Sequence, residues 1–243
     1  MRSKYLGIVF LLLACGPVHA ANVLYFADSF SGTNYVLPAL TAGSHTVTTA
    51  SSWSDFNTRL AGGGFDLAIA ICQANAHSLD VTTMSNYLNA GGNAILADWT
   101  QDGTFGALFG ATYAGVTNQT PATLTAATLY AGITNPVALL NPGWGVWSMG
   151  LTPTGTGTSL GTFPNGNACI VSSFGGRAIL LGFLADTLPS ADGQRFFENL
   201  IGTALTGTTN IPTLTEWGMI IFFVLITGVA LVNLKKRRNV AAC

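Results

Sequence analysis

The chain has 243 residues, of which 49% are hydrophobic and only 8% charged, a length that fits one domain or two small ones. Most of its positive charge lies at the two ends, in Arg2, Lys4, Lys235, Lys236, Arg237 and Arg238. Between residues 21 and 210, three arginines oppose nine acidic residues and leave a net charge of about −6. This part therefore lacks the basic surface that nucleic acids and anionic lipids require.

Residues 1–20 have the three parts of a secretory signal peptide. Arg2 and Lys4 supply the positive start, residues 5–13 are apolar, and the sequence Val-His-Ala ends at a small residue, Ala20. We expect cleavage after Ala20. An alternative is lipoprotein processing at Cys15, because the preceding Leu-Leu-Ala resembles a lipobox. Both routes predict export.

The exported part alternates between apolar strands and helices that end at glycines. This rhythm is typical of an α/β domain whose sheet is mostly parallel and doubly wound, as in flavodoxin-like folds. A helix with Phe56 and Leu60 on one face is expected to be capped by Ser54 or Asp55. Strands are expected at 22–27, 45–49, 65–71, 93–97, 168–172 and 176–184, and helices at 35–40, 80–89, 105–109 and 192–205.

Residues 113–165 interrupt the rhythm. They are rich in Thr, Gly, Pro and Asn, and they include Trp144 and Trp147. This composition favours an antiparallel β-rich insertion or sheet extension. The two tryptophans could offer a stacking surface for carbohydrate, or they could pack against the core or cover a sheet edge.

Four segments of the domain resemble the class I glutamine amidotransferase-like group, and especially its ThuA-like branch. They read FDLAIAICQA, YLNAGGNAILAD, GGRAILLGFLAD and GQRFFENLI. The resemblance implies a glutamine amidotransferase-like fold. It also implies a nucleophilic cysteine at the elbow after residues 93–97, yet residues 97–100 read Ala-Asp-Trp-Thr. The missing nucleophile argues against an enzyme and leaves the question open.

Polar residues follow several of the predicted strands. Ligands of open α/β sheets bind outside the carboxyl ends of the strands. Such a rim could hold a hard cation or a sugar-like ligand, or the same side chains could cap turns and helices. No cofactor is predicted, and the identity of any metal stays open. The possible ligand rim consists of Asp28, Asn75, His77, Asp98 and Asp186.

Two cysteines remain in the exported part, Cys72 and Cys169. An oxidising compartment would allow them to form a disulfide. Their apolar flanks are equally compatible with two inert, buried thiols. A catalytic pair of Cys72 with His77 is a further, weaker alternative.

The end of the chain carries an ordered set of signals. The sequence IPTLTEWG precedes the uncharged run 219–234, which is extended by Trp217 and followed by basic residues that favour the cytoplasmic side. Such a run is short but sufficient for a membrane span. The basic residues are Lys235, Lys236, Arg237 and Arg238, and the motif residues are Ile211, Pro212, Thr213, Leu214, Glu216, Trp217 and Gly218.

This order resembles the IPTL-CTERM protein-sorting signal of exosortase substrates. The resemblance implies a membrane protease of the exosortase type as partner, with cleavage near Pro212 and Thr213. The expected protein is exported, anchored in the inner membrane and then passed to the cell envelope or surface. Its domain would act as a binding or structural module, with extracellular polysaccharide as a possible partner. The alternative is a hydrolase-like enzyme or carbohydrate-binding protein that uses the rim carboxylates.

The expected organisation assigns every part of the chain to a segment. It consists of a signal peptide (1–20), an exported α/β domain (21–205), a linker (206–210), a sorting signal (211–238) with a transmembrane helix (217–234), and a cytoplasmic tail (239–243).

Overall fold

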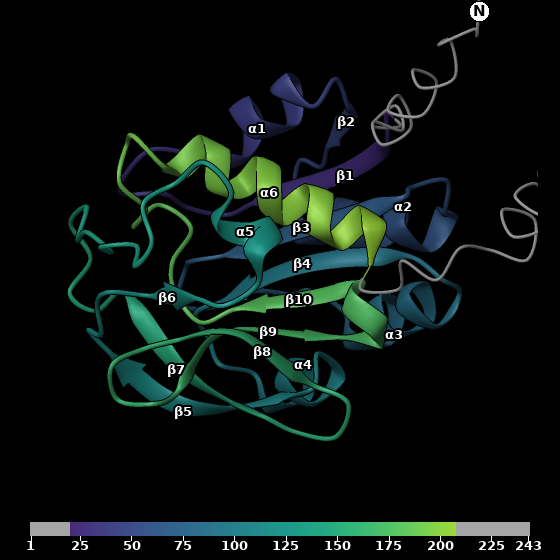
Figure 1. Cartoon of the computed structure of the whole chain (residues 1–243). Coiled ribbons are helices and arrows are strands. Elements are labelled where there is room, and N and C mark those ends of the chain that lie inside the picture. The colour runs from purple at the N-terminus through teal and green to yellow at the C-terminus, as the bar shows by residue number, and fades with distance from the viewer. Residues whose placement is uncertain (1–19, 208–243) are drawn as a thin grey trace, which may run out of the picture. The chain divides into compact units, whose positions relative to one another are not determined.

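The computed structural model describes residues 20–207, which form one ten-stranded sheet with helices on both faces (Figure 1). The signal peptide as far as residue 19, and the predicted sorting signal, transmembrane helix and cytoplasmic tail, lie outside the described residues. Within residues 20–207, no helix has both the length and the apolar character that a membrane span needs.

Five strands run parallel, and most are apolar along their whole length, as expected for strands with helices on both faces. Their order is β2-β1-β3-β4-β10, and Ile69 of β3 lies opposite Ile95 of β4. The corresponding predicted strands are confirmed. The five strands are β1 (Asn22–Ala27), β2 (Thr46–Thr49), β3 (Leu67–Cys72), β4 (Asn93–Asp98) and β10 (Ala178–Leu181).

Two groups of helices cover the two faces of the parallel strands. Strand β3 shows why both faces are buried, since successive side chains of a strand point to opposite sides. Its Ile69 and Ile71 join the core cluster of Phe196, whereas its alanines join that of Phe56. One face carries α1 (Val36–Ala42), α5 (Ala127–Tyr130) and α6 (Gly193–Thr206), and the other α2 (Trp53–Gly62), α3 (Val81–Asn89) and α4 (Gly103–Leu108).

The other half of the sheet is antiparallel, so the sheet is mixed and the expectation of a mostly parallel sheet is wrong. The β-rich character predicted for residues 113–165 is confirmed. The antiparallel strands are β5 (Ala111–Thr117), β6 (Thr123–Leu124), β7 (Ser148–Pro153), β8 (Thr158–Thr162) and β9 (Ala168–Ser173).

The change of direction occurs at β9. The sequence pattern treats residues 168–172 as a further member of the α/β rhythm, but β9 runs antiparallel to β10. The two strands are joined by the short 3-10 turn η1 (Phe174–Gly176), in which Phe174, Gly175 and Gly176 all have positive φ. A turn this short can join only antiparallel neighbours, because a parallel crossover needs a dozen or more residues.

The cap of α2 also differs from the expectation. Ser52, and neither Ser54 nor Asp55, is the N-cap, and its side chain accepts a hydrogen bond from the Asp55 backbone N–H at 3.1 Å. Asp55 in turn accepts from the Ser51 backbone N–H at 2.9 Å. The two side chains therefore share the capping of the helix start.

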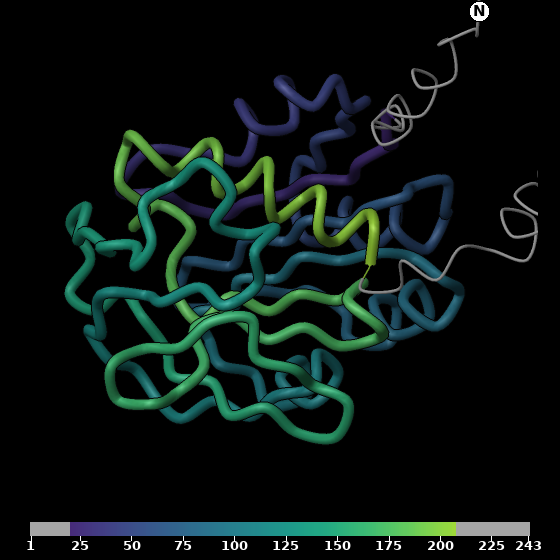
Figure 2. Tube along the Cα trace, in the orientation of Figure 1, coloured from purple at the N-terminus to yellow at the C-terminus, as the bar shows by residue number. Residues whose placement is uncertain are grey.

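Two opposite edges of the parallel strands matter for the rest of the molecule. We call the edge at which these strands end the carboxyl edge, and the edge at which they begin the amino edge. Figure 2 shows that the described chain enters β1 and leaves α6 on the same side. Ala21 and Thr206 both line one cavity there, so both ends lie at the amino edge.

Candidate functional site

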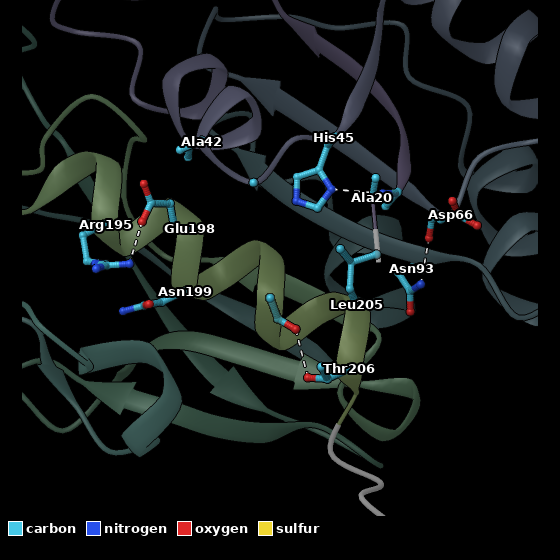
Figure 3. A pocket seen from close by; sticks show the side chains of 14 residues that line it. Ala20, Ala42, His45, Asp66, Asn93, Arg195, Glu198, Asn199, Leu205 and Thr206 are labelled. Atoms are coloured by element: carbon cyan, nitrogen blue, oxygen red, sulfur yellow. Dashed lines mark hydrogen bonds and ion pairs between the residues drawn. The ribbon is translucent and has the colours of Figure 1, made fainter. Parts of the chain in front are cut away.

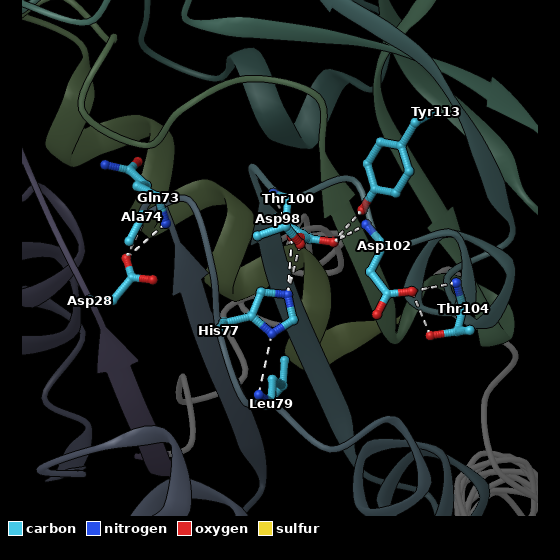
Figure 4. A network of polar contacts seen from close by, with 10 residues as sticks. All are labelled: Asp28, Gln73, Ala74, His77, Leu79, Asp98, Thr100, Asp102, Thr104 and Tyr113. Atoms are coloured by element: carbon cyan, nitrogen blue, oxygen red, sulfur yellow. Dashed lines mark hydrogen bonds and ion pairs between the residues drawn. The ribbon is translucent and has the colours of Figure 1, made fainter.

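The carboxyl edge carries a buried carboxylate at the end of β4. The Asp98 side chain has no exposed surface. Its Oδ1 accepts hydrogen bonds from the Thr100 backbone N–H (2.9 Å) and the Thr100 hydroxyl (2.6 Å). Its Oδ2 accepts from the Asp102 backbone N–H (2.9 Å) and the Tyr113 hydroxyl (3.2 Å) (Figure 4).

His77 completes the shell around this carboxylate from the loop after β3. Its Nε2 lies 3.2 Å from Asp98 Oδ1 and 3.0 Å from the Thr100 hydroxyl. Its Nδ1 accepts a hydrogen bond from the Leu79 backbone N–H at 3.2 Å, so in the neutral ring the proton resides on Nε2. The imidazole is enclosed by the rings of Trp53 and Phe105, with centroids 5.8 and 5.7 Å away.

The pKa values of His77 and Asp98 are shifted in opposite directions. The hydrogen bond to the Asp98 carboxylate raises the pKa of His77, although burial acts in the opposite direction. Burial works to raise the pKa of Asp98, but hydrogen bonds from His77, Thr100 and Asp102 together hold it below its usual value. Asp98 is therefore an ionised, fully bonded anchor of the turn between β4 and α4.

This arrangement differs from a catalytic triad although it contains a hydroxyl, an imidazole and a carboxylate. A triad places the hydroxyl and the carboxylate on opposite nitrogens of the ring. Here Thr100 and Asp98 both face Nε2, and the Thr100 hydroxyl donates its own proton to Asp98. No ring nitrogen remains to act as a base toward Thr100.

Gln73 connects three loops of the carboxyl edge. The residue is 1% exposed, and its side chain donates to the Ser29 carbonyl at 3.0 Å and accepts from the Ala185 backbone N–H. Its backbone N–H donates to Asp28 Oδ1 at 2.8 Å. The segments that follow β1, β3 and β10 are thus joined through one side chain.

Asp28 is only partly satisfied. Its Oδ1 accepts from the backbone N–H groups of Gln73 and Ala74, whereas its Oδ2 is buried and has no hydrogen-bond partner within residues 20–207. Burial raises the pKa of Asp28, because the charged form is poorly solvated. In Figure 4 its carboxylate lies apart from the ring of His77.

Asp186 holds a different pair of loops together. It accepts from the backbone N–H groups of Ser31 (2.8 Å) and Gly32 (2.9 Å) and from the Trp144 indole at 3.0 Å. Trp144 is half-buried, and Trp147 packs partly buried against the core. For these tryptophans the structure agrees with a packing role.

The predicted ligand rim therefore forms only in part. His77 and Asp98 contact each other, Asp28 and Asp186 each fasten other loops, and Asn75 is exposed. Within residues 20–207, no group of three or more His, Cys, Asp or Glu side chains is placed to hold a metal ion. Sequence reasoning missed Gln73, which follows β3 as Asp28 follows β1, and Tyr113, for which no local pattern exists.

The two cysteines are free thiols, each buried and each on a different face of the sheet. Cys72 belongs to β3 and Cys169 to β9, and strands β4 and β10 lie between them. Three strand spacings amount to about 14 Å, far beyond the reach of a disulfide. Burial raises the pKa of both thiols, and both nitrogens of His77 are engaged elsewhere, so a reactive Cys72–His77 pair is absent.

Comparison with solved structures decides the fold. A candidate GMP synthase component from Thermoplasma acidophilum is similar with a TM-score of 0.53 and 12% identity, covering 77% of this chain and 96% of that one. A glutamine amidotransferase from Thermotoga maritima is similar with a TM-score of 0.50 and 9% identity, covering 77% and 97%. The fold is glutamine amidotransferase-like. A candidate ThuA-like protein from Bacteroides uniformis gives a TM-score of 0.48, with 11% identity over 81% and 93%.

The glutamine amidotransferase-like likeness extends to the fold and not to an activity. No family model matches the sequence, and no curated protein is similar enough to count as a relative. The turn after β4 contains neither Cys nor Ser. Its residue with positive φ is Gln101 (φ 55°), and its hydroxyl, on Thr100, is bonded to Asp98.

Proposed function

We propose that this chain is an exported, membrane-anchored protein of the cell envelope or surface, processed by an exosortase-type protease. Its α/β domain serves as a binding or structural module. The observation that carries the proposal is the order of signals at the C-terminal end, from IPTLTEWG through the apolar run 219–234 to Lys235, Lys236, Arg237 and Arg238. The signal peptide predicted at residues 1–20 agrees with it.

The carboxyl edge supports a non-catalytic role for the domain. Its buried polar side chains accept hydrogen bonds from backbone groups of neighbouring loops, as Asp98, Gln73 and Asp186 show. A group that is already saturated by protein donors offers little to a substrate. Such bonding is what a stable, non-catalytic module needs.

Intact-mass measurement of the surface-released protein tests the processing step. We expect a C-terminus near Pro212 and Thr213 in a host with the matching exosortase, and an intact tail in a host without it. Replacing Ile211 and Pro212 by alanine should prevent cleavage, whereas the control replacements Thr208→Ala and Thr209→Ala should not. A released protein that ends after Leu234 would show that the tail is an ordinary anchor.

A further inference from the structure

At the amino edge, the residue that follows the predicted signal-peptidase site is buried and hydrogen-bonded. Ala20 is exposed, whereas Ala21 is only 5% exposed. The backbone nitrogen of Ala21 donates to His45 Nδ1 at 3.1 Å, and its carbonyl accepts from the Thr46 backbone N–H at 2.9 Å. Ala20 is thus exposed and Ala21 is buried and hydrogen-bonded, on either side of the peptide bond that signal peptidase is predicted to cleave.

His45 is suited to accept a hydrogen bond at this position. Burial lowers its pKa, so the ring is neutral near pH 7 and Nδ1 retains its lone pair. Gly43 leaves room for the ring, since a Cβ at residue 43 would lie 2.5 Å from His45 Nε2. Nδ1 is thereby directed at the start of β1.

A cavity of about 790 Å³ lies at this edge, and Ala20, Ala21 and His45 are among the residues that line it. Figure 3 shows His45 and Ala20 in its wall. Two carboxylates line it, Asp66 and Glu198, together with Arg195. Arg195 pairs with Glu198 at 2.8 Å, and Asp66 accepts from the Asn22 backbone N–H at 2.8 Å. The walls hold two negative charges against one positive charge, so an additional cation is favoured there.

We propose that the amino edge is a binding site for the α-ammonium group of Ala21, created when signal peptidase hydrolyses the Ala20–Ala21 bond. Water supplies the oxygen that makes Ala20 a carboxylate, and the released nitrogen takes up protons and becomes the ammonium. His45 Nδ1 accepts one of its N–H groups, and the others face the cavity. The inference rests on the proposed export and on cleavage after Ala20.

Cleavage would strengthen a contact that already exists. Before cleavage the Ala21 nitrogen is a neutral amide, and afterwards it is a cation, because an α-amino group has a pKa of about 7.7–8.0. Hydrogen bonds with one ionised partner are roughly twice as strong as neutral ones. Signal-peptide cleavage would therefore strengthen the hydrogen bond that holds the start of β1 against His45.

The sequence offers a direct probe of this amine. The lysines of the chain are Lys4, Lys235 and Lys236, so the α-amine of Ala21 is the one primary amine between residues 21 and 234 after signal cleavage. The exported protein is treated with formaldehyde and cyanoborohydride at pH 7. Dimethylation of the tryptic peptide 21–59 is then followed by mass spectrometry.

We expect labelling in the native wild type to be slower than in His45→Ala by about tenfold, the factor that the loss of one charge-assisted bond produces. His45→Asn, whose side-chain oxygen can replace Nδ1, should keep most of the protection. Ala42→Ser, a change in the same cavity away from the amine, should label like the wild type. All four proteins should label equally fast in denaturant.

The results separate this site from the export proposal. An N-terminus other than Ala21, such as a lipidated Cys15 or an intact leader, overturns both. An Ala21 terminus that labels equally fast in the wild type and in His45→Ala overturns the site and leaves export standing. If His45→Ala does not accumulate, the native and denatured wild type are compared, and equal rates overturn the site.

Discussion

The two edges of the parallel strands are built in different ways. At the carboxyl edge, buried side chains such as Asp98 and Gln73 are surrounded by backbone donors and acceptors from several loops. At the amino edge, Asp66 and Asn93 are on the surface or half-buried, and an open cavity lies between α1 and α6. Open α/β sheets hold ligands outside the carboxyl ends of their strands. Here the polar groups of that edge bond to one another and to the backbone, and a cavity of about 790 Å³ lies at the opposite edge.

The largest effect that this comparison predicts is for Asp98→Ala. The change leaves the Thr100 and Asp102 backbone N–H groups and the Tyr113 hydroxyl without their acceptor in a buried place. We expect a loss of about 3–5 kcal/mol in the free energy of unfolding, measured by urea denaturation of the exported protein with tryptophan fluorescence.

The matched change at the amino edge is Asp66→Ala. Asp66 is exposed and accepts one backbone hydrogen bond, from Asn22 at 2.8 Å. Its replacement should cost less than about 1 kcal/mol. If Asp98→Ala proved as mild as Asp66→Ala, the carboxylate would not anchor the carboxyl edge, and the contrast between the edges would fail.

For Gln73→Ala we expect an effect smaller than that of Asp98→Ala but larger than that of Asp66→Ala. This change removes the links to Ser29 and Ala185 and leaves both backbone groups unpaired, with an expected cost of about 2–3 kcal/mol by the same denaturation measurement. Gln73→Glu should be no better, because it loses the donor to Ser29 and brings a second carboxylate close to Asp28.

The control for Gln73 is Asn93→Ala, which removes a single 2.7 Å bond to the Asp66 carbonyl at the amino edge. Its expected cost is less than about 1 kcal/mol. Equal losses for Gln73→Ala and Asn93→Ala would mean that the loops of the carboxyl edge do not depend on one buried side chain.

Local sequence patterns were sufficient to predict most of the strands and helices. They did not predict that half of the sheet is antiparallel. The apolar run that became β3 and the segment that became α3 are both short-range features, although Asp80, expected as the first helical residue, is the N-cap of α3. The direction of β9 is not encoded in its apolar residues, which fit either orientation. It follows from the shortness of η1, whose residues with positive φ include the non-glycine Phe174.

The candidate site shows the same limit. Asp28 and Asp98 could be found because each follows an apolar strand. Their partners could not, since the bond from Ser31 to Asp186 spans 155 residues and Tyr113 reaches Asp98 from the antiparallel half. Whether a strand-end carboxylate binds a ligand or fastens a loop depends on these long-range contacts.

The smallest predicted effect is on the pH dependence of stability. It distinguishes the two edges because the pKa of His77 is raised and the pKa of His45 is lowered. The pKa of His77 is raised, chiefly by Asp98 and further by Asp102 and Asp28, so its contribution is complete below pH 6.5 and is lost as the pH rises through the folded pKa. The pKa of His45 is lowered by burial, in a cavity that Asp66, Glu198 and Arg195 also line, so its protonation costs stability as the pH falls below 6.5.

Replacing one histidine at a time should therefore change the pH dependence in opposite senses. Between pH 7 and pH 5, His45→Asn should lose less stability than the wild type, and His77→Gln should lose more. The comparison uses urea midpoints at each pH, so a uniform loss of stability in either variant cancels. If both variants shifted the slope the same way, the two histidines would not differ in the sign of their pKa shifts, and the contrast between a charged carboxyl edge and a neutral His45 at the amino edge would not hold.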